Sequence, residues 1–163
     1  MSHRRNLAVF SVLLLSACAS QDPRRASDEV KQYCASRYED RRIDPIRQKM
    51  LIPIAVDQPQ PIEILANRQK ANEAEKTALL ALAEARNACN TFTESQVGQP
   101  PSYRQHTQDR ITTTLADLYA GDITFGEFAK TLLFIGERDK LAREDLERAV
   151  RQHERFPDLD PWN

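Results

Sequence analysis

The sequence predicts an all-α protein, a small bundle of four or five helices with a proline-rich extended connection. Three observations predict it. Apolar residues recur three and four positions apart in several segments, and residues typical of helix N-termini precede those segments. No segment shows sustained alternation of apolar and polar residues. The chain has 163 residues, which suits one domain with a modest core.

A first helix is expected from Ser27 onward, because a serine side chain can cap the free backbone N–H groups of a helix start. Its apolar face carries Val30, Cys34 and Tyr38 at helical spacing. A second, short helix is expected at Asp44-Pro45, since proline is favoured at the first helical position.

An extended connection is expected over residues 52–62. Pro53, Pro59 and Pro61 exclude a regular helix or a central strand there. A short stretch of this segment has apolar residues at alternate positions, so it could line a groove or pair with a partner strand. We expect an ordinary connector, and a binding role for this segment is the alternative.

The next helix has the clearest start. Asn72 and Glu75 form the pattern of a capping box, in which each side chain bonds the other's backbone N–H. Its apolar stripe consists of Ala78, Leu82, Ala85, Cys89 and Phe92. Gly98, Pro100 and Pro101 end this helix.

A helical hairpin is expected after these prolines. Ser102 and Gln105 form a second capping-box pattern, and Gly121 is placed to close the helix in the left-handed conformation. The buried face of this helix carries Ile111, Leu115 and Leu118. Thr124 and Glu127 form a third capping box for the last helix, with Ile123 packing on Phe128 as a hydrophobic staple.

The last helix carries a heptad seam. The seam runs through Phe125, Phe128, Leu132, Ile135, Asp139, Ala142, Leu146, Ala149 and His153. We expect it to pack inside the domain, and the alternative is a homodimer. Gly136 costs about 1 kcal/mol in a helix interior, so a kink or break is expected near it. The acid–base pairs expected on the solvated face are Asp139–Arg143, Glu144–Arg148 and Glu147–Arg151.

The N-terminus has the pattern of an export signal. Arg4 and Arg5 precede the short apolar run Leu7–Leu15, which is too short to span a bilayer. The following Leu15-Ser16-Ala17-Cys18 resembles the lipobox of bacterial lipoproteins. The resemblance implies cleavage before Cys18, a lipid on that cysteine and, with Ala19 after it, the outer membrane. An ordinary signal peptide is the alternative.

The expected organisation follows from this cleavage. Residues 1–17 are the signal peptide, 18–27 a lipidated tether, 28–155 the helical domain and 156–163 a C-terminal tail. With Cys18 lipidated, Cys34 and Cys89 remain as a pair in an oxidising compartment, which favours a disulfide. Two buried free thiols are the alternative.

The segment from Leu115 to Leu133 resembles the short C-terminal domain motif, G-x-I-T-x-x-E-F followed by Leu-Leu. That resemblance implies a helical hairpin used in association rather than in catalysis. Here the motif is followed by a long helix instead of the chain end.

Several classes of function are disfavoured by composition and motifs. Loss of the signal leaves 21 basic against 24 acidic residues, which does not suit a nucleic-acid binder. The four glycines are too scattered for a phosphate loop, and no HExxH, CxxC or G-x-S-x-G motif occurs. We therefore expect no cofactor, no metal and no catalysis.

The expected function is that of a lipid-anchored envelope protein near the outer membrane, facing the periplasm, that binds, scaffolds or assembles another envelope protein. Phe156 and Trp162 in the tail are candidate partner contacts, although the tail could equally pack on its own domain. The alternatives are a peptidoglycan-acting enzyme, or a regulator of one, and a binder of small amphiphiles.

Overall fold

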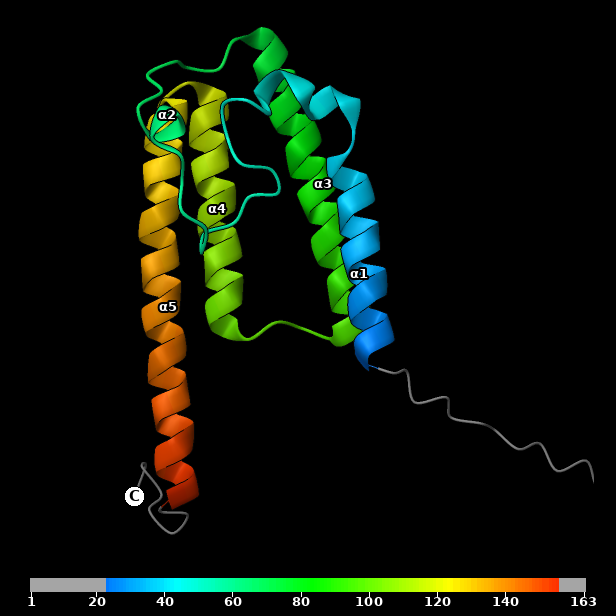
Figure 1. Ribbon diagram of the computed structural model, residues 1–163, viewed down its shortest axis with the longest axis vertical. Coiled ribbons are helices and arrows are strands. Elements are labelled where there is room, and N and C mark those ends of the chain that lie inside the picture. Colours follow the sequence, from blue (N-terminus) through cyan, green and yellow to red (C-terminus); the bar gives the residue numbers. More distant parts are fainter. Residues whose placement is uncertain (1–22, 156–163) are drawn as a thin grey trace, which may run out of the picture.

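The computed structural model describes residues 23–155, which form a bundle of helices (Figure 1). Four long helices are joined by two short ones, so the all-α expectation is confirmed. In chain order they are α1 (Pro23–Tyr38), the 3-10 helix η1 (Arg41–Ile46), α2 (Ile62–Leu65), α3 (Glu73–Val97), α4 (Ser102–Ala120) and α5 (Phe125–Arg155). Helix α1 packs on α3, and α4 packs on α5. Cys18, Phe156 and Trp162 lie outside the described residues.

The core forms where the apolar stripes of α3, α4 and α5 meet η1. The expected stripe residues of α3 and α4 are buried, apart from Cys89 and Phe92, which are half-buried. The largest fully buried side chains are those of Phe125, Phe128, Ile43, Ile46, Leu79, Leu82 and Leu118. Burial of these side chains is the main source of stability.

Two of the three expected capping boxes are confirmed. The backbone N–H of Glu75 donates to Asn72 at 3.0 Å, and the N–H of Asn72 donates to Glu75 at 3.0 Å. The N–H of Glu127 donates to the Thr124 hydroxyl at 3.2 Å, and the N–H of Thr124 donates to the Glu127 carboxylate at 2.8 Å. These bonds from Thr124 lower the pKa of Glu127. Gly121 ends α4 at φ 81°, as expected.

The third capping box, Ser102 with Gln105, is wrong. Pro101 is the cap, and its carbonyl accepts hydrogen bonds from the N–H groups of Arg104 and Gln105. Ser102 is therefore already inside the helix, where its side chain cannot cap the helix start.

Two other helix starts also lie earlier than expected. Helix α1 begins at Pro23 rather than after Ser27, because proline is tolerated in a first turn and Ala26 is buried there. The helix expected at Asp44 begins at Arg41, because the Asp40 carboxylate accepts the backbone N–H of Arg42 at 2.8 Å. Pro45 therefore lies inside η1 instead of starting it.

The expected disulfide is present. Cys34 of α1 and Cys89 of α3 are bonded, with their Cα atoms 5.0 Å apart. The rings of Tyr33 and Phe92 stack beside them, with centroids 4.2 Å apart. Among residues 24–38 of α1, only Ala26 is an apolar residue that is fully buried, so the disulfide and this ring pair are major links to α3.

Replacing Cys34 by serine should lower the free energy of unfolding by about 4 kcal/mol, because the disulfide closes a 55-residue loop and restricts the unfolded chain. Thermal unfolding followed by circular dichroism, with and without reductant, measures this loss. Reductant should have no further effect on the Cys34→Ser variant. Equal melting of the oxidised and reduced wild type would contradict the prediction.

The heptad seam of α5 is buried along only half of its length. Leu132 and Ile135 are buried, whereas Ala142, Leu146 and Ala149 are exposed, since α5 continues past the start of α4 (Figure 1). The expectation that the whole seam packs inside the domain is therefore wrong for its second half. A homodimer through that half stays a prediction. A bilayer span would need a longer apolar run than any helix between residues 23 and 155 contains.

Replacing a leucine by alanine should destabilise the protein more in the first half of the seam than in the second. Leu132→Ala removes a buried side chain and should cost about 2–5 kcal/mol of unfolding free energy. Leu146→Ala changes an exposed position and should cost less than about 0.5 kcal/mol. Denaturant unfolding of both variants at low protein concentration measures the difference. Equal losses would mean that the second half is covered in solution.

Candidate functional site

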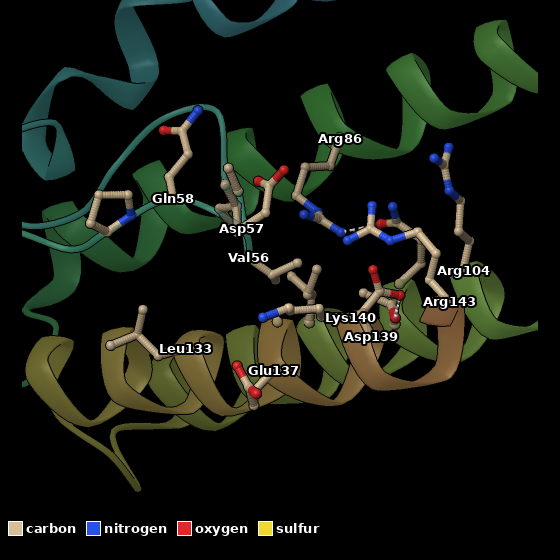
Figure 2. A pocket seen from close by; sticks show the side chains of 17 residues that line it. Val56, Asp57, Gln58, Arg86, Arg104, Leu133, Glu137, Asp139, Lys140 and Arg143 are labelled. Atoms are coloured by element: carbon tan, nitrogen blue, oxygen red, sulfur yellow. Dashed lines mark hydrogen bonds between the residues drawn. The ribbon is translucent and has the colours of Figure 1, made fainter. Parts of the chain in front are cut away.

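A recess lies between α3, α4, α5 and the extended connection of residues 51–61 (Figure 2). Its volume is about 660 Å³. Its polar lining includes Arg86 from α3, Arg104, Thr107 and Gln108 from α4, and Asp139, Lys140 and Arg143 from α5. We call this recess the pocket.

The extended connection forms one wall of the pocket. Ile52, Ile54 and Val56 pack against the core at alternate positions, which accounts for their spacing. The segment therefore lines a groove. We had expected an ordinary connector and had given groove lining as the other possibility. The connection ends one residue earlier than expected, because Pro61 serves as the N-cap of the one-turn helix α2.

Gly136 allows the connection to lie against α5. A Cβ atom on Gly136 would stand 1.8 Å from the carbonyl oxygen of Val56, far inside any permitted contact. Helix α5 runs unbroken from Phe125 to Arg155, so the expected break near Gly136 does not occur. The glycine is explained by the close approach of another backbone, one of the uses of glycine in a helix.

Arg86 of α3 is one of the residues that line the pocket. Its side chain is only 5% exposed. One guanidinium nitrogen donates to the side-chain oxygen of Gln108 at 2.5 Å, and Asn90 donates to the same oxygen at 3.3 Å. Burial lowers the pKa of Arg86, an effect that nearby Tyr38 opposes. Because an arginine remains protonated at neutral pH, α3 places a permanent positive charge in the interior.

Arg143 does not form the ion pair that the sequence predicted for it. The Asp139 carboxylate accepts a hydrogen bond from the Thr107 hydroxyl of α4 at 2.8 Å, and the expected Asp139–Arg143 pair is absent. Packing of α4 on α5 supplies this competing donor. The expected Glu147–Arg151 pair is present at 3.7 Å. Arg148 pairs with Asp145 at 3.2 Å rather than with Glu144.

Positive charge therefore gathers around the pocket. None of Arg86, Arg104, Lys140 and Arg143 forms an ion pair with a carboxylate among residues 23–155. Figure 2 shows Arg143 directed toward Arg86, whereas the charged ends of Arg104 and Lys140 point away from this pair. The acids that also line the pocket are Asp57, Glu137 and Asp139. This arrangement can bind a negatively charged group.

The sequence did not single out these cations, although Arg86 carried a signal. Leu79, Leu82, Arg86 and Cys89 are spaced by three, four and three positions, which places the arginine on the buried stripe of α3. Arg143 was assigned to the solvated face, because an acid stands four residues before it. Cys34 and Cys89 join α1 to α3 and do not line the pocket.

No known protein family, curated protein or solved structure matches this chain. Residues 23–155 contain no group of three histidine, cysteine or acidic side chains arranged to hold a metal ion.

Gly136→Ala should destabilise the protein, because the added methyl group must push the Val56 backbone away from α5. Overpacking of this kind costs about 1–3 kcal/mol, whereas the same change in an open helix stabilises by about 1 kcal/mol. Thermal unfolding measures the sign. Glu137→Ala, at the exposed neighbouring position, is the control and should change stability little. A higher melting temperature for Gly136→Ala would contradict the close approach.

Proposed function

We propose that this protein is a lipid-anchored binding protein of the bacterial cell envelope, which holds an anionic partner molecule in the pocket without catalysing a reaction. The observation that carries the proposal is the pair of arginines, Arg86 and Arg143, which converge on one recess without carboxylate partners. Guanidinium groups keep their charge at neutral pH and donate several hydrogen bonds in a fixed plane, which suits binding better than proton transfer.

The lipobox supports the anchored location. Cys18 precedes the first described residue, Pro23, by five positions, and an extended chain spans about 3.3 Å per residue, or roughly 17 Å in all. A lipid on Cys18 would therefore keep the start of α1 close to a bilayer. The exposed end of α5 lies at the same end of the bundle as the start of α1 (Figure 1). We place the protein on the periplasmic face of the outer membrane, on the evidence of Ala19 after the lipobox cysteine.

Cys18→Ala should abolish incorporation of labelled fatty acid and release the protein from sedimented membranes, because the thioether that carries the lipid cannot form. Labelling with radioactive palmitate and fractionation after a high-salt wash measure both effects. Cys34→Ser is the matched control, and it should keep the label and stay with the membranes.

Two results would count against the proposal. A Cys18→Ala variant that still takes up labelled palmitate would show that Cys18 does not carry the lipid. Cleared peptidoglycan in a zymogram of the purified full chain would replace the non-enzymatic function by the alternative of a cell-wall enzyme.

A further inference from the structure

We infer that the ligand of the pocket is a phosphate ester, whose phosphate group is bound by Arg86 and Arg143. The inference rests on the proposed function, because it names the ligand of the same pocket. It does not depend on which membrane holds the anchor.

The buried guanidinium of Arg86 is the first reason. Removing a charge from water is costly unless a partner compensates for it, and Gln108 offers Arg86 only one neutral oxygen, shared with Asn90. The guanidinium of Arg86 forms no other hydrogen bond with the described residues. Its remaining N–H groups form a planar fork that matches the oxygens of a phosphate or a carboxylate.

The arrangement of the other cations favours phosphate over carboxylate. The positive side chains come from three helices, with Arg86 on α3, Arg104 on α4, and Lys140 and Arg143 on α5. A carboxylate has one charge and two oxygens in one plane, and a single guanidinium can satisfy both. A phosphate monoester carries a charge of about −1.5 to −2 at neutral pH and three strong acceptor oxygens, which suit donors from several directions.

The remainder of the pocket indicates an ester rather than free phosphate. A volume of about 660 Å³ lies within the range of about 300–1,000 Å³ that is typical of small-molecule sites. Apolar side chains also line it, namely Ile54, Val56, Ile111 and Leu133. Figure 2 shows Leu133 and Glu137 away from the arginines, where they would contact the organic part of the ligand.

The test is titration calorimetry of glycerol phosphate into the full chain, kept in a neutral detergent. The wild type should bind one equivalent, and Arg86→Gln and Arg143→Gln should each weaken binding about tenfold or more, since each removes a charged hydrogen-bond donor. Arg41→Gln is the matched control, because Arg41 is exposed on η1 and lies outside the pocket. It should bind as the wild type does.

Because Arg86 is buried, its replacement could disturb folding, and Arg143 provides the decisive variant, since its side chain is exposed. Three results would each overturn the inference. They are no binding by the wild type, equal affinity of the wild type and Arg143→Gln, and binding of acetate as tight as that of glycerol phosphate.

The source of the phosphate is resolved by a second titration, with dihexanoyl phosphatidic acid below its micelle concentration. Binding much tighter than that of glycerol phosphate would identify a lipid headgroup, and equal binding would identify a soluble ester; either result supports a phosphate site. The anchor is tested separately by Cys18→Ala. If glycerol phosphate does not bind, but the wild type takes up labelled palmitate and Cys18→Ala does not, the inference of a phosphate ligand is wrong and the proposed lipid anchor is retained.

Discussion

The bundle depends on the placement of an extended segment, residues 51–61, against both of its helix pairs. Helices α1 and α3 form one pair, joined by a disulfide, and α4 and α5 form the other. Direct packing between α3 and α4 is less extensive than packing within either pair. Ile52, Ile54 and Val56 complete the core between them, and the backbone at Val56 reaches α5 only because Gly136 has no side chain. A single missing methyl group thus permits the arrangement of both pairs.

The same constraint creates the pocket. Arg86 and Arg143 belong to different helix pairs, and they face one recess because the connection forms its wall. Two like charges that face one recess, neither of them in an ion pair with a carboxylate, oppose folding. The apolar core, the disulfide and the capped starts of α3 and α5 supply stability that offsets this cost. Electrostatic repulsion that is retained in a recess, although it lowers stability, is typical of binding sites.

Local features of the fold could be predicted from the sequence because their causes lie within a few residues. The capping boxes at Asn72 and Thr124 join residues three positions apart, and Gly121 ends a helix through its own backbone freedom. Other predictions failed at helix starts, where Pro101 and Asp40 serve as the caps, and at sites where a neighbour distant in the sequence intervened. Thr107 took the hydrogen bond of Asp139 that was expected to go to Arg143, and Val56 explained a glycine that was expected to break α5.

By itself, the sequence determined the helical class, the stripes that form the core, the pair of cysteines that join α1 to α3, and the expectation of a lipid anchor at Cys18. These follow from periodicity, capping chemistry and short motifs. Only the tertiary structure decided that half of the α5 seam stays exposed and that Arg86 and Arg143 share a pocket. The physical reason is that these two residues are 57 positions apart, and spacing along one chain does not specify which side chains from different helices will meet.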